Sequence, residues 1–252
     1  MNYADREIMA IRAGRLIKNG DIVFAGTGLA LIAATVAKKI HAPKAVVFFE
    51  TGGIDPSLDE LPMTVADSRV MSGTSINSGL IEAFSIVGHR RLHTIAFLGA
   101  AQIDKFGNLN STSIGDYKKP KVRFPGSGGA CDAASLASGV IIFMQHGKEK
   151  FVKKVHYLTS PGWLGGCNSR EKSGLQRGGP IAVVTNLGVM KFDELTKEMY
   201  LAEYYPGVTI DQIIENTSFE INVSGATEST SPSQEELRIL REEVDPQRLI
   251  LA

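Results

Sequence analysis

Glu50 is the residue of this sequence best placed to act as a nucleophile. It follows the apolar run Val46-Val47-Phe48-Phe49 and precedes Thr51-Gly52-Gly53. A carboxylate beside an apolar strand is costly unless it is hydrogen-bonded or functional, and in a partly apolar pocket it can attack an activated acyl group. A loop or helix-capping carboxylate is the alternative. The glycines favour a functional role, because they let another backbone or a ligand approach closely.

Two glycine clusters offer backbone amides for binding negative charge. Gly26-Thr27-Gly28 lies between an expected strand and an expected helix, so its amides could bind an anion at a helix N-terminus. A tight turn is the alternative reading, and Leu31 in place of a third glycine argues against a dinucleotide fingerprint. Gly126-Ser127-Gly128-Gly129-Ala130 could form an oxyanion hole or a phosphate cradle. A flexible loop is the alternative there, but the helix that follows directly favours a fixed one.

Other reactive residue types form no recognisable constellation. Cys131 and Cys167 have no second cysteine nearby and no histidine at ligand spacing, which argues against a disulfide framework or a zinc site. The five histidines are scattered, so no metal site is expected. Asp104-Lys105-Phe106-Gly107-Asn108 reads as a turn. The basic run from Lys118 to Arg123 could meet phosphates but is more typical of a solvated face.

Composition excludes several classes of protein. The chain has 252 residues, of which 43% are hydrophobic, enough for a sizeable core. Lys+Arg and Asp+Glu number 27 each, so the net charge gives no general attraction to nucleic acid or anionic lipid. The first residues lack a signal-peptide pattern, and no apolar run approaches the roughly 20 residues of a membrane span. A cytoplasmic protein without nucleic-acid or membrane partners is therefore expected.

Strands that alternate with helices must position these residues. Residues 5–19 have apolar side chains at helical spacing, and a second helix is expected from about residue 29 to 40, after Gly26-Thr27-Gly28. A short helix is expected from about Ser233, which Glu236 follows at capping-box spacing. Strands are expected at residues 21–25, 45–49, 94–98 and 139–144, with a hairpin formed by 181–185 and 189–192. This order predicts an α/β fold, an open and largely parallel sheet flanked by helices. Sites in such sheets lie at the carboxyl ends of strands, which is where Glu50 falls.

No linker divides the chain. We expect a single domain over residues 1–252, with a looser C-terminal segment over 224–252 that begins with a run of small polar residues.

Taken together, these segments resemble the β subunits of family I CoA-transferases, of the glutaconate CoA-transferase type. The resemblance covers nearly the whole chain and includes Gly107–Tyr117 and Thr159–Trp163, within which the long stretch from Asn108 to Tyr117 and the segment Ser160-Pro161-Gly162-Trp163 are the most specific parts. Further matching segments are Gly26–Leu29, Glu50–Gly52, Gly99–Asp104, Gly126–Ala130, Lys191–Asp193 and Arg241–Pro246.

The resemblance implies a catalytic role for Glu50. In this family the corresponding glutamate carries a glutamyl-CoA thioester in a ping-pong exchange of CoA between an acyl-CoA and a carboxylate, which here would be a glutaconate-like or 3-oxoacid-like molecule. Gly26, Gly28, Gly128 and Gly129 are the candidates for the oxyanion and CoA loops. The resemblance also implies a separate α subunit, in a heterodimer or heterotetramer-type assembly. It implies a CoA thioester as substrate, with no permanently bound cofactor and no metal.

Three alternatives remain open from the sequence. Some relatives are hydrolases that open rings on CoA thioesters and lack the glutamate, and others are decarboxylases with a cysteine in its place. A non-catalytic CoA-binding subunit that kept the fold is the third. Glu50 favours transfer over both other chemistries.

Overall fold

The computed structural model describes residues 3–251, which divide into two units. The first unit contains the chain up to Phe97 together with the segment from Ser231 onward, and the second contains Leu98–Thr230. Strand β5 (Thr94–Gly99) carries the chain from one unit to the other. The expected single domain over residues 1–252 stays a prediction.

The first unit is built on a sheet with the strand order β5-β1-β2-β3-β4. Strands β1 (Ile22–Phe24), β2 (Val46–Phe48) and β5 are parallel, whereas β3 (Gly53–Ile54) and β4 (Ile76–Asn77) join as antiparallel edge strands. The register pairs Phe24 with Phe48, so β1 and β2 end at the same level. The side chains of Val47, Phe48 and Phe49 are buried, as expected for a strand covered on both faces.

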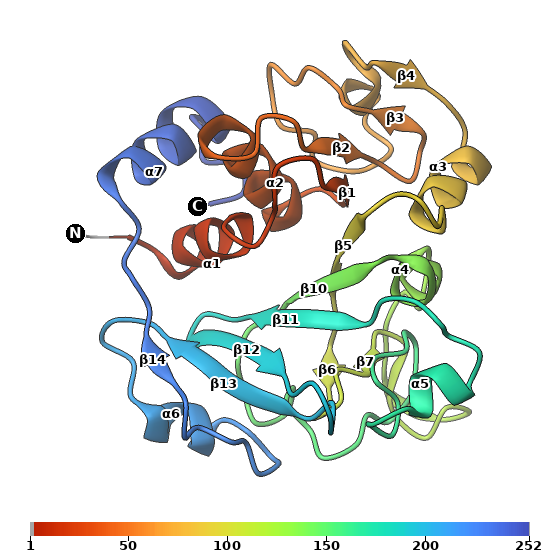
Figure 1. Cartoon of the computed structure of the whole chain (residues 1–252), viewed down its shortest axis with the longest axis vertical. Helices are drawn as coiled ribbons and strands as arrows, with labels where there is room; N and C mark the ends of the chain where they lie inside the picture. The colour runs from red at the N-terminus through yellow and green to blue at the C-terminus, as the bar shows by residue number, and fades with distance from the viewer. Residues whose placement is uncertain (1–2, 252) are drawn as a thin grey trace. The chain divides into compact units, whose positions relative to one another are not determined.

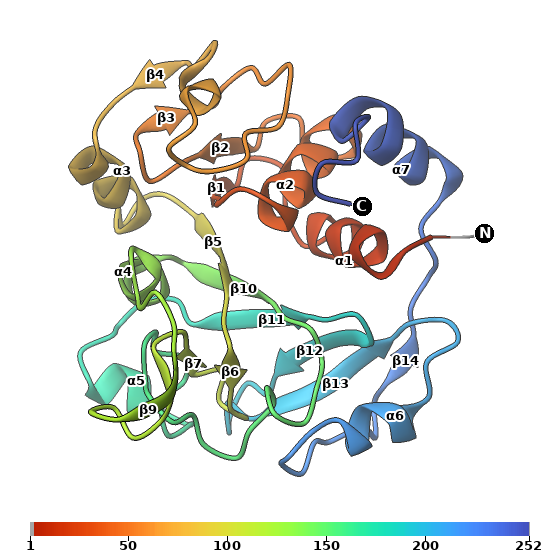
Figure 2. The ribbon, with the colours of Figure 1, turned by 180° about the vertical axis from the view of Figure 1, so that it is seen from behind.

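Helices of the first unit bring together segments far apart in the sequence. Helix α1 (Asp5–Gly14) packs so closely on α2 (Leu29–Ile40) that a Cβ at Gly14 would lie 2.9 Å from the Ala33 carbonyl oxygen. Helix α7 (Gln234–Arg238) and the π-helix that continues it (Ile239–Val244) lie beside these two helices (Figures 1 and 2). A 3-10 helix (Ser68–Met71) and helix α3 (Leu80–Val87) complete this unit.

Two bidentate ion pairs fasten the C-terminal helix, which is α7 together with its π-helical continuation, to α1 and its C-cap residue Arg15. Arg241 donates to both carboxylate oxygens of Glu7, at 2.6 and 2.7 Å, and Arg15 does the same to Glu236, at 2.7 and 2.6 Å. Glu7 is only 3% exposed, and its hydrogen bonds from Arg241 hold its pKa below the usual value. A buried carboxylate left without its partner would be strongly destabilising, so the C-terminal helix is an integral part of this unit.

The second unit contains strands in the order β14-β13-β12-β11-β10 (Figure 1). Its strands are β10 (Gly139–Phe143), β11 (Pro180–Val184), β12 (Gly188–Phe192), β13 (Met199–Tyr204) and β14 (Thr227–Glu228). Two small hairpins pair β6 (Gln102–Ile103) with β7 (Leu109–Asn110) and β8 (Ser113–Gly115) with β9 (Pro120–Arg123). The helices are α4 (Ala130–Leu136), α5 (Ser169–Lys172) and α6 (Ile210–Glu215).

The α/β class predicted from the sequence is confirmed. The central strands β5, β1 and β2 of one unit are parallel, as are β10 and β11 of the other, and the antiparallel strands lie toward the edges. The predicted helix at 29–40, the hairpin between β11 and β12 and the capping box at Ser233 are all present. No helix among the described residues has the length and apolar character of a membrane span.

His146 makes the stability of the second unit depend on pH. Its ring stacks on Phe151 with centroids 4.0 Å apart, and its Nε2 lies 3.0 Å from the Thr217 hydroxyl. Burial lowers its pKa to about 4. Since the unfolded chain takes up this proton near pH 6.5 and the folded chain only near pH 4, stability falls as the pH drops through that window. We expect a loss of about 2 kcal/mol between pH 7 and pH 5, measured by urea unfolding.

The control is His146→Phe, which keeps the stacked ring but cannot take up a proton. Its unfolding free energy should depend less on pH between 7 and 5 than that of the unmodified chain. Equal pH slopes for the two chains would contradict the role assigned to His146.

Candidate active site

Glu50 opens a three-residue turn between β2 and β3. The Phe49 N–H donates to the Gly53 carbonyl and the Gly52 N–H donates to the Phe49 carbonyl, both at 3.0 Å. Gly52 adopts a left-handed conformation with φ of 102°. This is the geometry of a three-residue hairpin loop, in which a turn is followed by a glycine that reverses the chain. The turn holds the half-buried Glu50 at the carboxyl end of β2.

The two glycines after Glu50 allow close backbone approach, as the sequence predicted. The Gly52 carbonyl accepts hydrogen bonds from the backbone N–H and the hydroxyl of Ser78, both at 3.0 Å. A Cβ at Gly52 would lie 2.0 Å from the Ser78 carbonyl oxygen, and a Cβ at Gly53 would lie 2.3 Å from that of Val70. Ser78 was missed by sequence reasoning, because nothing in its own neighbourhood signals a contact 26 residues away.

The Thr51 hydroxyl is a second feature of this turn that the sequence did not indicate. Its oxygen is buried and has no hydrogen-bond partner within residues 3–251. A buried hydroxyl without a partner is unusual, and here it directly follows the candidate nucleophile.

The Gly26-Thr27-Gly28 segment lies at the same edge of the sheet as Glu50. Phe24 and Phe48 are partners in the register of β1 and β2. Gly26 comes two residues after Phe24, and Glu50 comes two residues after Phe48. The Ala25 N–H donates to the Phe48 carbonyl at 3.1 Å, which extends the pairing to this edge. Gly28 is the N-cap of α2 and has φ of 84°, which an L side chain rarely adopts. The first turn of α2 therefore begins beside the turn that holds Glu50, with the positive end of its dipole at this edge.

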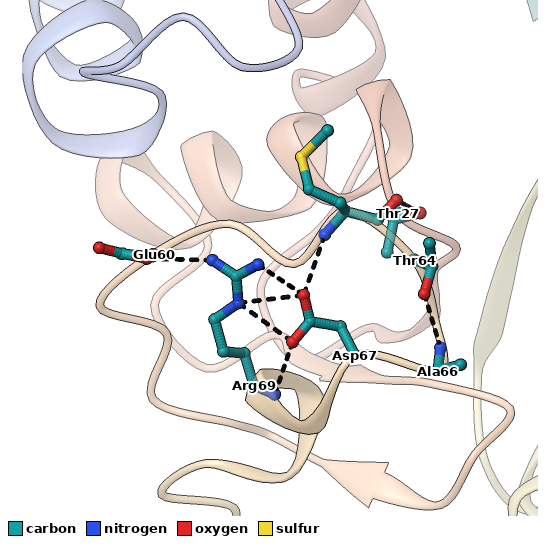
Figure 3. A network of polar contacts seen from close by, with 7 residues as sticks. Thr27, Glu60, Thr64, Ala66, Asp67 and Arg69 are labelled. Carbon is teal, nitrogen blue, oxygen red and sulfur yellow. Dashed lines mark hydrogen bonds and ion pairs between the residues drawn. The ribbon is translucent and has the colours of Figure 1, made fainter.

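A loop held together by hydrogen bonds and ion pairs, over residues 60–69, contacts Thr27, which lies between Gly26 and Gly28 (Figure 3). The Thr27 hydroxyl donates to the Met63 carbonyl at 3.4 Å, and the Met63 N–H donates to Asp67 at 3.4 Å. Arg69 binds the Asp67 carboxylate through Nε and Nη2 and reaches Glu60 at 3.0 Å. Hydrogen bonds from Arg69 hold the pKa of Asp67 well below its usual range. Asp67 therefore stays ionised and keeps this loop against the Gly26–Gly28 segment.

The second glycine cluster belongs to the second unit and is fixed by hydrogen bonds. Gly126 exchanges hydrogen bonds with Ser111, whose hydroxyl donates to the Gly126 carbonyl at 2.9 Å. The Ser127 hydroxyl accepts from the Cys131 N–H at 3.0 Å. Gly129 is the N-cap of α4, directly after Gly128. The loop is therefore held at both ends, as expected from the helix that follows it. The roles of Gly128 and Gly129 stay predictions.

Arg170 anchors the far end of α4. The residue is 2% exposed, and its guanidinium donates to the carbonyls of Ala134 and Ser135 in the last turn of α4. It also donates to Pro161 and Gly162, in the Ser-Pro-Gly-Trp segment singled out from the sequence. Burial lowers the pKa of Arg170 to about 10, so it remains protonated at neutral pH. A single side chain thus joins the helix of the second glycine loop to that segment.

We expect Arg170→Lys to destabilise the chain by about 2–3 kcal/mol. One ammonium group cannot serve all the carbonyls that a planar guanidinium reaches from several nitrogens, and two of these carbonyls, those of Ala134 and Gly162, are buried. Urea unfolding would measure the change, with the exposed Arg90→Lys as the matched control. If both variants unfold at the same urea concentration as the unmodified chain, Arg170 does not have this role.

The remaining sequence motifs take structural positions. Asp104 accepts from the N–H groups of Phe106 and Asn108, and the Asn108 amide donates to it at 2.9 Å, so the predicted turn is present and buried. The run Lys118 to Arg123 is largely exposed, as predicted for a solvated face. Both cysteines are free. Within the described residues, no group of three or more histidine, cysteine or acidic side chains could hold a metal.

Comparison with known proteins identifies the class that this fold and site define. Residues 6–216 match the family described as coenzyme A transferase. The chain belongs to the coenzyme A transferase family.

Individual relatives narrow the class to one kind of subunit. The chain is 45% identical to the B-type subunit of glutaconate CoA-transferase of Acidaminococcus fermentans, over 97% of this chain and 94% of the relative. It is 38% identical to the B-type subunit of 3-oxoadipate CoA-transferase of Pseudomonas knackmussii, over 95% and 92% of the two chains. The crystal structure of glutaconate CoA-transferase from A. fermentans matches with a TM-score of 0.96 and 44% identity, covering 100% of this chain and 98% of that chain. The predicted β-type CoA-transferase subunit is confirmed.

Proposed function

We propose that Glu50 is the nucleophile of a CoA-transferase that moves CoA from an acyl-CoA to a free carboxylate. The observation that carries this proposal is the turn from Glu50 to Gly52. It holds a half-buried carboxylate at the carboxyl edge of parallel strands, beside the N-terminus of α2. That edge is where sites form in α/β sheets, and CoA transfer without loss to water requires a carboxylate nucleophile.

The reaction proceeds in two halves. A Glu50 carboxylate oxygen attacks the thioester carbonyl of the donor, the C–S bond breaks, and an acyl-glutamyl anhydride and the CoA thiolate form. The thiolate then attacks the glutamyl carbonyl of the anhydride, which releases the donor carboxylate and leaves a glutamyl-CoA thioester. The acceptor carboxylate attacks this thioester, and the thiolate expelled in that step attacks the acceptor's carbonyl in the new anhydride. Acyl-CoA leaves and Glu50 is restored, with no water consumed.

Each attack creates a tetrahedral oxyanion that needs hydrogen-bond donors. The backbone amides around Gly26 and Gly28 are the first candidates, because they lie at the edge where Glu50 is held. The positive end of the α2 dipole adds to their effect. Amides at Gly128 and Gly129 are the second candidates, on a loop that hydrogen bonds fix.

The relatives suggest an acid with a second carboxylate as substrate. The names of the two curated relatives described above contain glutaconate and 3-oxoadipate, which are both dicarboxylates. Both relatives are named as one subunit of a transferase, which implies a second, α-type subunit as partner. We propose a heterodimer or heterotetramer-type assembly that acts on a glutaconate-like or 3-oxoacid-like molecule as its CoA thioester.

Trapping the intermediate tests the proposal. The complex with the α subunit is incubated with acyl-CoA and then with borohydride, which reduces a glutamyl thioester to an alcohol. We expect activity to be lost only when acyl-CoA is present, and peptide mass spectrometry to place the change at Glu50. Release of free acid and CoA without exchange between carboxylates would instead indicate a hydrolase, and binding without turnover would indicate a non-catalytic subunit.

A further inference from the structure

The second unit contains a cavity of about 530 Å³ that includes none of the predicted site residues. One wall is the segment Lys153–Leu158, and the other contains Asp104, Phe106, Asn108 and Leu164. Its volume falls in the range of small-molecule sites, and its lining combines apolar side chains with a few polar groups, as such sites do.

Leu164 forms part of this wall in an unfavourable backbone conformation. Its φ is 56°, a left-handed value that a leucine rarely adopts. The buried Asn108 holds it there: Asn108 Oδ1 accepts from the Leu164 N–H at 3.1 Å, and Nδ2 donates to the Leu164 carbonyl at 2.9 Å. Asp104 fixes that amide in turn, at 2.9 Å. Strain maintained by a buried polar pair is typical of functional sites.

Tyr157 offers a flat surface whose orientation is fixed. It stacks on Tyr117 with centroids 5.1 Å apart and an interplanar angle of 22°. The Arg123 guanidinium covers the Tyr117 ring at 4.8 Å, which makes a stack of three layers. Tyr157 is also part of the cavity lining. A planar ring held in this way suits stacking against a nucleobase.

Cations and a hydrogen-bond donor lie along the same wall. Lys153 and Lys154 are exposed, and within residues 3–251 neither forms an ion pair. The Gly115 N–H donates to His156 Nδ1 at 3.2 Å, so the neutral ring carries its hydrogen on Nε2. Among the described residues that line the cavity, the only carboxylate is that of Asp104, which is turned to Asn108 and Phe106. The wall therefore favours an anion.

We infer that this cavity binds the nucleotide part of a phosphorylated ligand, with the base against Tyr157 and Leu164 and the phosphates on Lys153 and Lys154. Two sources share this chemistry, namely the nucleotide end of CoA and a free nucleotide. The first source rests on the proposed function, whereas the second does not.

Titration calorimetry on the complete complex tests the cavity, with adenosine 3′,5′-bisphosphate as the probe. The double variant Lys153→Ala, Lys154→Ala should weaken binding about tenfold or more, and Tyr157→Leu should weaken it similarly. The matched control is Lys148→Ala, Lys172→Ala, which removes two exposed lysines of the same unit that do not line the cavity. Unchanged affinity in the cavity variants, or no binding to the unmodified complex, would overturn the inference.

Leu164→Gly separates binding from folding. Glycine adopts this backbone conformation freely, so the apparent Tm should not fall, while affinity for the probe should drop because part of the wall is gone. A variant with unchanged Tm and unchanged affinity would show that Leu164 does not contact the ligand, and the placement of the base would be wrong.

Two further measurements distinguish the sources. If the site takes the end of CoA, acyl-CoA competes with the probe, dephospho-CoA binds more weakly than CoA, and the lysine variants raise KM for acyl-CoA but not for acyl-pantetheine. If ATP competes with the probe and acyl-CoA does not, the ligand is a free nucleotide. Failure of the proposed function appears separately, as absence of the trapped thioester at Glu50 in the unmodified complex.

Discussion

Replacing Glu50 by glutamine is expected to lower kcat for CoA transfer by at least about 10⁴-fold. A neutral amide cannot form the acyl anhydride, whereas the turn itself depends on backbone hydrogen bonds of Phe49, Gly52 and Gly53, which the substitution leaves intact. Glutamine also has nearly the same size as glutamate. The loss should therefore come from the chemistry, with KM for acyl-CoA little changed.

Steady-state kinetics on the complex with the α subunit would measure this effect. The matched control is Glu194→Gln, which makes the same chemical change at an exposed position of the second unit and should leave kcat unaltered. Thermal unfolding should give similar midpoints for both variants. A Glu50→Gln enzyme that retains more than a few per cent of the original kcat would rule out Glu50 as the nucleophile.

Gly52→Ala is expected to have the second-largest effect, on both stability and turnover. Alanine is strained at φ of 102°, and its Cβ would lie 2.0 Å from the Ser78 carbonyl oxygen. Because that contact is with backbone, no side-chain rotation can relieve it. Strain and overpacking together should cost about 4 kcal/mol unless the turn moves. A turn that moves displaces Glu50, and a displacement near 1 Å should lower kcat about 100-fold.

Gly20→Ala provides a control that contains the strain without the clash. Gly20 also has a left-handed φ, of 92°, but a Cβ there would meet no atom within 4 Å. We expect it to cost about 1–2 kcal/mol and to leave kcat unchanged. The difference between the two variants, in urea unfolding and in kcat, isolates the contact with Ser78. Equal effects of the two substitutions would contradict that contact.

The sequence predicted the features that depend on neighbouring residues. The apolar run before Glu50 indicated a buried strand, and the glycines after it indicated close backbone approach. Both predictions are confirmed. They could be made because a run of apolar residues and the absence of a Cβ are properties of the local sequence. The sequence placed α2 at about residues 29–40, directly after Gly26-Thr27-Gly28, and the helix spans Leu29–Ile40 with Gly28 as its N-cap.

What the sequence could not show are contacts between distant segments. Ser78 hydrogen-bonds to Gly52, Arg69 orders a loop against Thr27, and Arg170 joins α4 to the Ser-Pro-Gly-Trp segment. Each depends on how the chain returns to itself, and each side chain is unremarkable in its local sequence. The strained Leu164 was invisible for the same reason, because its conformation is imposed by Asn108, 56 residues earlier.

The ion pair between Glu7 and Arg241 has a consequence for the order in which the protein is made. The first unit takes its helices from both sides of the second unit in the sequence, so a ribosome releases all of residues 98–230 before the partner of Glu7 emerges. Until then a carboxylate destined for burial must stay hydrated, and the surface of α1 and α2 that the C-terminal helix covers stays open. The second unit can fold during synthesis, whereas the unit that contains Glu50 is completed only after residue 241 has been added. Assembly of the unit that holds the candidate nucleophile therefore comes late in synthesis, after the second unit has been made.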